Sequence, residues 1–414
     1  MALTARAVMA NPARQHRGRT STTVLRATSV ALVLVVVLGV GGVAAQAAHG
    51  QTFTVLYSFK GYPDGASPHG ALLRDAEGNL YGTTYYGGTS DSGTVFKLSR
   101  SGKESVLYSF TWGTDGGSPS SGLIQDTAGN LYGTTEYGGD FTCNVYDGCG
   151  TVFKVDPSGT ETVIHSFTGP EGCYPFGGLL RDKVGNLYGT TQTCGSTRFG
   201  TVFKVDTSGT TTVLHNFTGF DGAYPTYTRL LMDKKSRLYG VTNSGGNSGE
   251  GVVYMLSKDG TETVLHSFTG VEGDGCYPFG TPIMDKNGIL YGTTNVCGIS
   301  SGIVWELRRN GAETVLHRFT GSDGAQPIGG VIMDARGNLY GDTSQGGGTG
   351  CGGYGCGTVF KLDTNGKETV LHRFTGLDGA YPFRGLIQDA EGNFYGTTGT
   401  GGSDSYGTVW KLTP

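Results

Sequence analysis

The pattern with the greatest influence on the architecture reads Asp182-Lys183-Val184-Gly185-Asn186-Leu187-Tyr188-Gly189-Thr190-Thr191. Its first half combines Asp, Gly and Asn, which favour tight turns, and its second half is a short strand candidate. Working outward, residues 178–181 form a strand candidate before the turn, and residues 201–205 form another after a Gly-rich loop. A tight turn at residues 206–209 leads to a fourth candidate at residues 212–217. The unit therefore predicts four short strands.

The same pattern occurs seven times along the chain. Its anchoring tyrosines are 49 to 56 residues apart, which suits a four-stranded propeller blade and is too long for leucine-rich, ankyrin or tetratricopeptide units. Gly accounts for 75 of the 414 residues. Gly and Pro together still stay below the level of about 25–30% that marks aperiodic low-complexity sequence, so we expect the glycines at turns. The anchoring tyrosines are Tyr81, Tyr132, Tyr188, Tyr239, Tyr291, Tyr340 and Tyr395.

The two ends of the repeat array complement each other. Residues 52–59 resemble an outermost strand without the rest of its unit, and residues 407–412 resemble a third strand without an outermost partner. Pairing of these two segments would close a ring and leave no exposed sheet edge. We therefore predict an all-β fold, a seven-bladed β-propeller of four-stranded blades closed by the N-terminal strand. An open solenoid is the alternative, but such arrays usually carry polar capping repeats, and none is visible in the sequence.

The first 47 residues have the features of a secretory signal peptide. They contain five arginines and no acidic residue, then an apolar run from Val30 to about Ala45, and then the small-x-small pattern Ala45-Gln46-Ala47. Cleavage is expected after Ala47 or after Ala45. An uncleaved membrane anchor is the alternative, although the apolar run is shorter than the about 20 residues that a spanning helix needs. Residues 48–414 are expected to form a single seven-repeat domain of an exported protein, which is secreted, periplasmic or at the cell surface.

The charge of the mature chain argues against one class of partner. Removal of residues 1–47 changes the net charge from −4 to −9, because five arginines are lost. Phosphate backbones are bound by clustered Lys and Arg, and we expect no such cluster in this acidic body. Nucleic acid is therefore not expected as a partner. We also expect a monomer without a membrane span in the mature chain.

The repeats resemble those of the exported GloVer-type tandem-repeat proteins. The resemblance rests on two signatures that recur in order, as in Gly78-Asn79-Leu80-Tyr81-Gly82-Thr83-Thr84 and Gly93-Thr94-Val95-Phe96-Lys97-Leu98, and it covers roughly residues 52–412. The fourth and fifth units depart from it: Ser236-Arg237 and Gly288-Ile289 replace Gly-Asn, and Met255 and Glu306 replace Lys. Members of the family often end in an anchoring tail, and no such tail is expected here. The resemblance implies export and repetition, and it implies no particular reaction.

Eight cysteines in an exported chain predict disulfides. In two pairs the cysteines are 21 residues apart and occupy the same register of the repeat, one before the inner strand and one after the second strand. In a propeller those two loops share one face, so each pair would meet within its own blade. The other two pairs are short and local. Zinc binding is the alternative, but no histidine lies near any pair. We expect no metal and no cofactor. The predicted disulfides are Cys143–Cys149, Cys173–Cys194, Cys276–Cys297 and Cys351–Cys356.

Histidines and acidic residues recur once per repeat. Five histidines hold one position in the outermost strand, where the other two units carry Tyr57 and Tyr108. Because these positions are spread around the rim, they cannot converge on a metal ion, and we expect a packing role. An acidic residue also precedes each inner strand. Asp-Gly is ordinary turn chemistry there, but the carboxylates are also able to attract cations or to accept hydrogen bonds from sugar hydroxyls. The acidic series is Asp64, Asp115, Glu171, Asp221, Asp274, Asp323 and Asp378.

Function is expected on one face of the ring. The hairpins of one face are short and nearly uniform, whereas the loops of the other face vary in length and composition. This variable loop face carries aromatic side chains beside the acidic series, and rigid aromatic side chains provide contact area at a small entropic cost. Part of the aromatic set is alternatively expected to pack beneath the loops. The candidate ligand-binding residues are Tyr174, Tyr224, Tyr227, Arg229, Tyr277, Tyr381, Asp221, Asp274 and Asp378.

The leading hypothesis is a recognition protein that binds an extracellular glycan or a protein on the variable loop face. A lyase or lactonase-like hydrolase is an alternative, with a site at the channel mouth, where Tyr227, Arg229 and Glu250 depart most from the repeat. His69 lies before an inner strand, and a catalytic role for it is a minor alternative. No nucleophile elbow, phosphate-binding loop or His-Glu-x-x-His motif is present, and a purely structural surface protein is the third hypothesis. Polar residues expected near the channel are Arg74, Gln125, Arg181, Arg229, Arg384 and Gln388.

Overall fold

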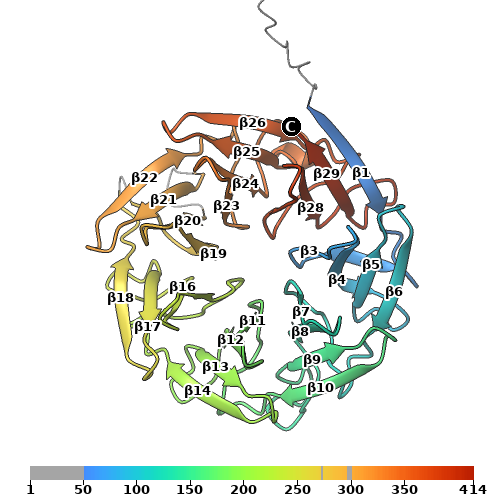
Figure 1. Cartoon of the computed structure of the whole chain (residues 1–414), viewed down its shortest axis with the longest axis vertical. Helices are drawn as coiled ribbons and strands as arrows, with labels where there is room; N and C mark the ends of the chain where they lie inside the picture. The colour runs from blue at the N-terminus through green and yellow to red at the C-terminus, as the bar shows by residue number, and fades with distance from the viewer. Residues whose placement is uncertain (1–50, 272–273, 296–300) are drawn as a thin grey trace, which may run out of the picture. The chain divides into compact units, whose positions relative to one another are not determined.

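The structure is a computed structural model that describes residues 51–271, 274–295 and 301–414. The predicted signal peptide therefore lies outside the described residues. The described part forms seven antiparallel sheets arranged in a ring around a central channel (Figure 1). None of its helices is both long and apolar enough to cross a membrane. The predicted seven-bladed β-propeller is confirmed.

Each blade contains four strands that run from the channel to the rim, and β2 (Gly65–Pro68) is an additional strand that pairs with β4. The first three blades are β3 (Leu73–Arg74), β4 (Leu80–Gly87), β5 (Thr94–Leu98) and β6 (Glu104–Ser109); β7 (Ile124–Gln125), β8 (Leu131–Thr135), β9 (Thr151–Val155) and β10 (Glu161–Ser166); and β11 (Leu180–Arg181), β12 (Leu187–Thr191), β13 (Thr201–Val205) and β14 (Thr211–Asn216).

The next three blades follow the same order around the ring. They are β15 (Leu231–Met232), β16 (Leu238–Thr242), β17 (Val252–Leu256) and β18 (Glu262–Ser267); β19 (Pro278–Met284), β20 (Leu290–Thr294), β21 (Ile303–Leu307) and β22 (Glu313–Arg318); and β23 (Val331–Met333), β24 (Leu339–Thr343), β25 (Thr358–Leu362) and β26 (Glu368–Arg373). A short 3₁₀ turn, η1 (Cys351–Gly353), lies between β24 and β25.

The seventh blade joins the two ends of the chain. It contains β27 (Ile387–Gln388), β28 (Phe394–Thr398) and β29 (Thr408–Thr413), and its outermost strand is β1 (Thr52–Ser58). β1 pairs antiparallel with β29, from Thr52 opposite Thr413 to Ser58 opposite Thr408 (Figure 1). The predicted closure by the N-terminal strand is therefore confirmed.

The glycine of each Leu-Tyr-Gly-Thr-Thr segment lies beneath an aromatic ring of the third strand. A Cβ atom added to Gly189 would lie 2.6 Å from the ring of Phe203, and one added to Gly82 would lie 2.7 Å from the ring of Phe96. Carbon atoms cannot approach so closely without displacing the ring. The two halves of the repeat signature therefore depend on each other through direct packing.

The aspartate of the repeat signature anchors the turn that enters the second strand. The Asp182 carboxylate accepts hydrogen bonds from the backbone N–H of Asn186 at 2.9 Å, from Asn186 Nδ2 at 2.7 Å and from the Tyr188 hydroxyl at 3.1 Å. In the fourth blade Arg237 replaces the asparagine, and its Nε donates to Asp233 at 2.7 Å. This departure from the repeat therefore preserves the anchor with a different donor.

The apolar core lies between neighbouring blades. Each outermost strand is followed by a phenylalanine that is at most 5% exposed, and its ring packs against an aromatic side chain of a neighbouring blade. Most of these contacts are edge-on, as between Phe167 and Phe203 at 5.0 Å between ring centroids, and that of Phe268 with Trp305 is tilted. Such contacts hold the blades side by side. The phenylalanines are Phe59, Phe110, Phe167, Phe217, Phe268, Phe319 and Phe374.

Candidate functional site

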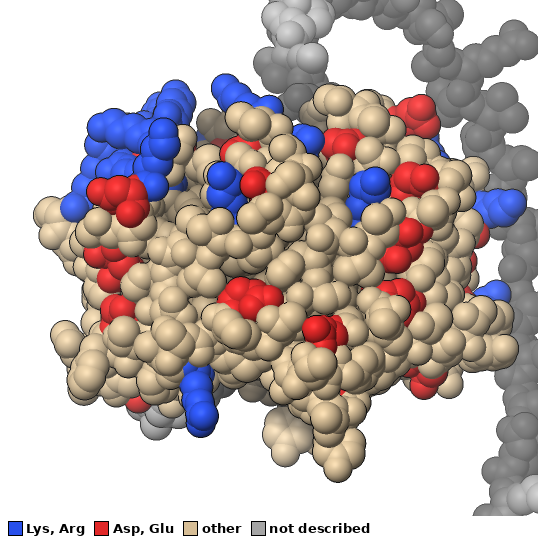
Figure 2. All heavy atoms as spheres, turned by 90° about the horizontal axis from the view of Figure 1, so that it is seen from below, with Lys and Arg blue, Asp and Glu red and all other residues tan. Residues whose placement is uncertain are grey.

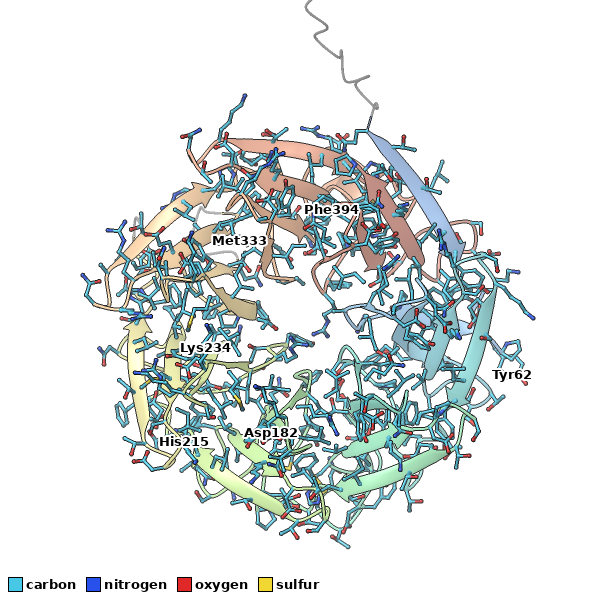
Figure 3. The ribbon with its side chains drawn as sticks, viewed as in Figure 1. Tyr62, Asp182, His215, Lys234, Met333 and Phe394 are labelled. Carbon is cyan, nitrogen blue, oxygen red and sulfur yellow. A yellow bond between two sulfur atoms is a disulfide. The ribbon has the colours of Figure 1, made fainter. Side chains whose placement is uncertain are left out.

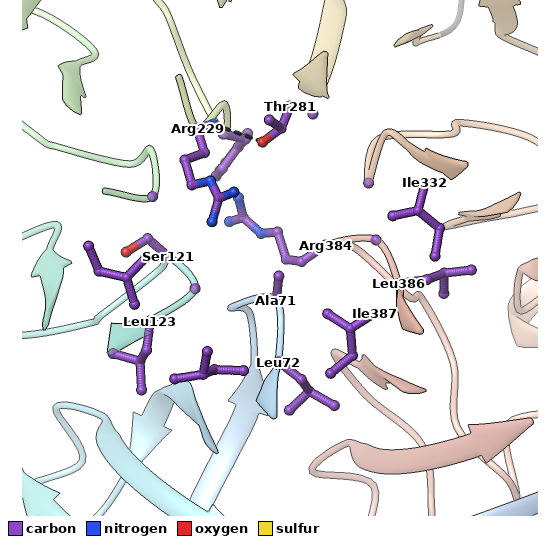
Figure 4. A pocket seen from close by; sticks show the side chains of 18 of the residues that line it. Ala71, Leu72, Ser121, Leu123, Arg229, Thr281, Ile332, Arg384, Leu386 and Ile387 are labelled. Atoms are coloured by element: carbon purple, nitrogen blue, oxygen red, sulfur yellow. Dashed lines mark hydrogen bonds between the residues drawn. The ribbon is translucent and has the colours of Figure 1, made fainter. Parts of the chain in front are cut away.

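The central channel contains a cavity of about 630 Å³ that is lined by the inner strands (Figure 4). Two arginines, Arg229 before β15 and Arg384 before β27, extend their side chains into it, and their guanidinium groups lie side by side in Figure 4. Of the other polar residues expected near the channel, Arg74, Gln125 and Gln388 line the cavity. Arg181 does not belong to this lining.

The two arginines differ in their immediate contacts. The Arg384 guanidinium lies over the ring of Tyr227, 4.0 Å from its centroid, which is a cation–π contact. Burial lowers the pKa of Arg384 to about 10, although the nearby Tyr227, Glu136 and Tyr85 act in the opposite direction. Burial also lowers the pKa of Arg229, although its side chain keeps more exposed surface than that of Arg384. Both side chains remain charged at neutral pH.

A buried glutamate lies close to the channel mouth. Glu136 is 3% exposed, and its carboxylate accepts a hydrogen bond from the Tyr85 hydroxyl at 2.8 Å. Burial raises the pKa of Glu136 to about 7, against the lowering effect of hydrogen bonds from Tyr137 and Tyr85 and of the Arg384 charge. We did not predict this residue. The sequence did contain a signal, because in no other repeat is the Leu-Tyr-Gly-Thr-Thr segment followed directly by an acidic residue.

His69 lies half-buried near the mouth. Its ring packs against those of Tyr85, at 4.9 Å between centroids, and Phe383, at 5.4 Å. Burial, together with the charge of Arg384, lowers the pKa of His69 to about 3, so the imidazole is neutral at physiological pH. These contacts account for His69 as a packing residue.

A second buried carboxyl group was missed. Asp342 occupies the place of a threonine of the Leu-Tyr-Gly-Thr-Thr segment, and it is 1% exposed. In the first blade the equivalent Thr83 hydroxyl donates to the Ser121 carbonyl of the next blade at 2.9 Å. Burial raises the pKa of Asp342 to about 7, against a weak lowering by the N–H of Gly385, which approaches without full hydrogen-bond geometry. In its protonated form Asp342 retains a hydroxyl donor at this position.

The acidic series pairs with the histidine series, a relation that sequence analysis did not predict. His372 Nε2 lies 2.9 Å from Asp378, and Asp378 also accepts hydrogen bonds from the backbone and hydroxyl of Thr375. In the two units without this histidine, the hydroxyls of Tyr57 and Tyr108 donate to the carboxylates instead. The carboxylates therefore fix the loop that follows each outermost strand. The other pairs are His165–Glu171, His215–Asp221, His266–Asp274 and His317–Asp323.

These pairs account for three candidate ligand-binding residues as structural groups. Burial raises the pKa of Asp378, but the hydrogen bonds from His372 and Thr375 outweigh this effect. The pKa of Asp378 is therefore lowered overall. Asp274 follows the same pattern with His266 and Thr269. A role of Asp221, Asp274 and Asp378 in ligand binding stays a prediction.

Four of the candidate tyrosines occupy one repeat position. Tyr174, Tyr224, Tyr277 and Tyr381 each precede a proline and have positive φ angles of 52° to 58°. Tyr224 and Tyr277 are 36% and 38% exposed. The hydroxyl of Tyr174 accepts a hydrogen bond from Asn144 at 2.9 Å, and that of Tyr381 donates to the Cys351 carbonyl at 3.3 Å. Two of the four therefore face solvent, and two fix neighbouring loops.

Three of the four predicted disulfides are confirmed. Cys143–Cys149, Cys173–Cys194 and Cys351–Cys356 have S–S distances of 2.10, 2.02 and 2.06 Å. The first two lie next to each other, with the Sγ atoms of Cys149 and Cys173 only 3.2 Å apart. Cys276 is disulfide-bonded, but Cys297 lies outside the described residues, so the pair Cys276–Cys297 stays a prediction.

The hairpin face contains a cavity of about 680 Å³ between the fourth and fifth blades. Basic side chains gather in one part of the surface (Figure 2), contrary to our expectation that this acidic chain lacks a basic cluster. Two of them are paired, Arg237 with Asp233 at 2.6 Å and Arg308 with Glu306 at 2.9 Å. The expectation that nucleic acid is not a partner stays a prediction. The basic residues of the cavity are Lys234, Lys235, Arg237, Lys286, Arg308 and Arg309.

No group of three or more His, Cys, Asp or Glu side chains is placed to hold a metal ion in the part of the chain that the structure describes.

Several solved structures are similar to this chain. A puromycin-hydrolysing peptidase of Mycobacterium tuberculosis is 10% identical, with a TM-score of 0.52 and coverage of 86% of this chain and 55% of that chain. The extracellular domain of a putative one-component system of B. thetaiotaomicron is 11% identical, with a TM-score of 0.50 and coverage of 85% and 39%. A gluconolactonase of Xanthomonas campestris is 15% identical, with a TM-score of 0.43 and coverage of 78% and 89%. At such identities a likeness concerns the fold and not the activity.

A search of curated proteins gave no match. The family model of the Gloeobacter/Verrucomicrobia repeat matches three overlapping regions, residues 38–146, 142–354 and 227–414. These regions include all seven blades and the closing strand. The chain therefore belongs to the Gloeobacter/Verrucomicrobia repeat family.

Proposed function

We propose that this protein is an exported recognition propeller that binds a glycan across its variable loop face. The observation that carries the proposal is the distribution of large apolar side chains that are exposed to solvent. Of thirteen such residues in the described part of the chain, only Val184 and Val264 lie away from this face. Figure 3 places Tyr62 at the outer rim. The other eleven are Tyr62, Tyr86, Val145, Tyr146, Phe220, Tyr224, Val271, Tyr277, Tyr354, Leu377 and Tyr406.

A concentration of exposed apolar surface on one face is typical of an interaction site. Most of these side chains are aromatic. A tyrosine offers a flat apolar ring for the C–H face of a sugar and a hydroxyl for its polar edge. A glycan is therefore the ligand class that best fits a surface of scattered rings.

The backbone supports a role for the exposed tyrosines. Every blade has a residue with positive φ before the proline that enters the inner strand, and this conformation favours Gly or Asn. The sequence uses neither residue there. Tyr224 and Tyr277 stay 36% and 38% exposed on this strained backbone, although the Tyr224 ring also contacts Phe199, so burial explains only in part why a large side chain occupies the position.

The disulfides support export. Bonds such as Cys173–Cys194 form and persist in oxidising compartments outside the cytosol. Secretion, a periplasmic location and a location at the cell surface all fit this observation.

A lactonase-like or lyase-like activity has weaker support. Among the residues that the structure describes, those lining the channel cavity include no carboxylate, histidine or cysteine. Glu136 has the raised pKa that suits a general acid or base, but it does not belong to the lining and is hydrogen-bonded to Tyr85.

The test is affinity electrophoresis of the mature protein in gels that contain laminarin, xylan, pullulan or soluble chitin oligosaccharides. We expect retardation by at least one glycan, and we expect Tyr224→Asn combined with Tyr277→Asn to abolish it. Asn tolerates positive φ, so the double variant should fold. Gln326→Asn is the matched control, because Gln326 occupies the same repeat position with φ of 58° and has no ring. Absence of retardation by every glycan, or equal retardation of the double variant, would refute the proposal.

A further inference from the structure

The mouth end of the inner strands is built from small residues in five of the seven blades. The two positions that lie five and four residues before the aspartate of the repeat signature, Gly177 and Gly178 before Asp182 in the third blade, contain only Gly, Ala, Ser or Thr in these five blades. The space is narrow: a Cβ atom added to Gly122 would lie 2.9 Å from the Ala71 carbonyl oxygen of the neighbouring blade. An arginine interrupts this pattern in two blades, at Arg229 and at Arg384.

The two arginines come from the fourth and the seventh blade and enter the same cavity. Figure 4 shows their side chains extending toward each other across the channel. Placing two like charges in a partly enclosed space is unfavourable unless something compensates for them. A purely architectural role would be filled better by the small residues that the other blades use.

Nothing among the described residues compensates for these charges fully. Neither guanidinium group forms an ion pair or a hydrogen bond with any described residue, and the cavity lining contains no Asp or Glu. The nearest carboxyl group that acts on Arg384 is that of Glu136, which is bonded to Tyr85 and is partly protonated at neutral pH. The donors of both arginines are therefore available to a ligand in the channel.

The wall next to the arginines is aliphatic. The inner strands contribute leucine, isoleucine and valine side chains to the same cavity, and several of them, such as Ile124 and Ile387, are only partly buried by the protein. Arg74, Gln125 and Gln388 follow at the far end of these strands. The leucine, isoleucine and valine residues of the lining are Leu72, Leu73, Leu123, Ile124, Ile283, Ile328, Val331, Ile332, Leu386 and Ile387. The cavity thus combines a cationic end with an apolar wall.

We propose that the central channel binds a monocarboxylate with an aliphatic body, whose carboxylate lies between Arg229 and Arg384 and whose chain lies along the leucine and isoleucine wall. Guanidinium groups hold carboxylates through paired charge-assisted hydrogen bonds. The aliphatic body gains free energy by leaving water for the apolar wall. This site is separate from the exposed tyrosines, and the inference does not depend on glycan binding.

The test is isothermal titration calorimetry of the mature protein with sodium octanoate. We expect saturable binding of one octanoate per protein. Arg229→Gln and Arg384→Gln should each weaken the affinity at least tenfold, because each removes one of two guanidinium partners. Arg181→Gln is the matched control, since Arg181 ends an inner strand but does not line the cavity. It should bind octanoate like the unaltered protein.

Two further measurements separate this role from a structural one. The Gln variants should melt at the same temperature as the unaltered protein or higher in the absence of ligand, because they remove uncompensated charge. Acetate and 1-octanol should bind at least tenfold more weakly than octanoate, since each lacks one part of the ligand. The variant with both Tyr224→Asn and Tyr277→Asn should retain octanoate binding, which distinguishes failure of this inference from failure of the glycan proposal.

Three results would overturn the inference. The first is the absence of saturable octanoate binding. The second is unchanged affinity in both arginine variants. The third is tighter binding of glucuronate than of octanoate, because it would keep the carboxylate but exclude the aliphatic body.

Discussion

Removal of β1 should unfold the ring rather than merely loosen its edge. Deletion of residues 51–59 removes six paired positions with β29 and the buried Phe59, and it exposes the side of Trp410 that Phe53 covers, at 5.6 Å between centroids. Loss of one fully buried phenylalanine costs about 3–5 kcal/mol. Loss of the whole strand therefore approaches the about 5–15 kcal/mol that stabilises a typical protein. The new edge at β29 would also be free to pair with other chains.

The assay is thermal melting followed by circular dichroism, with size-exclusion chromatography to report aggregation. The matched control is a circular permutant that starts at Lys60 and carries residues 51–59 after Pro414 through a copy of the turn at residues 206–209. Because Thr52 lies opposite Thr413, this turn connects the two strands directly. The deletion should aggregate or melt far below the full chain, and the permutant should regain a folded monomer. A monomeric deletion variant with unchanged melting would refute the role of β1 in closure.

Two other perturbations test the interior and the rim. Replacing both Cys173 and Cys194 by Ala should lower the free energy of unfolding by about 2–3 kcal/mol, because the disulfide closes a short loop. Urea titration of the oxidised protein measures this loss, and an unchanged unfolding midpoint would contradict the prediction. Burial and the charge of Asp115 raise the pKa of Glu161 from 4.5 to about 7, so its contribution to stability is fully present below pH 4.5 and is lost as the pH rises through 7. Glu161→Gln should therefore raise the melting temperature at pH 8 but not at pH 4.5. The gain in the free energy of unfolding should be ~1 kcal/mol or less, because the group is partly solvated. Glu77→Gln serves as a control on an exposed hairpin, and equal effects of Glu161→Gln at both pH values would exclude this mechanism.

The blades follow from the sequence because each depends on short-range patterns, and their closure follows because the first and last strands each lack a partner within their own unit. Turn residues, strand candidates and the two unmatched terminal strands are all visible without three-dimensional information. The disulfide Cys173–Cys194 was predictable for a related reason, since both cysteines belong to loops of one blade. The propeller topology alone brings such loops to one face.

The channel site depends on long-range geometry and was only partly predictable. Arg229 and Arg384 were expected near the channel, but their convergence depends on the closing of the ring, which brings the fourth and seventh blades to a common axis. Glu136 was missed because its importance arises from burial and from the hydroxyl of Tyr85 in the preceding blade. The pairs between histidines and acidic residues were missed for another reason. Their spacing of six to eight residues has no fixed geometry until the loop after the outermost strand is known.

The pairing of β1 with β29 also sets an order in time. Thr52–Ser58 leaves the ribosome near the start of synthesis, and its partner Thr408–Thr413 leaves at the end. At about 5–20 residues per second, β29 is synthesised tens of seconds after β1. The other six blades are each complete before the seventh blade, because the seventh needs both strands. During this interval the strand is free to pair with the unfinished edge of an earlier blade. Transport of the chain in an extended state until the last residue has emerged would prevent such mispairing.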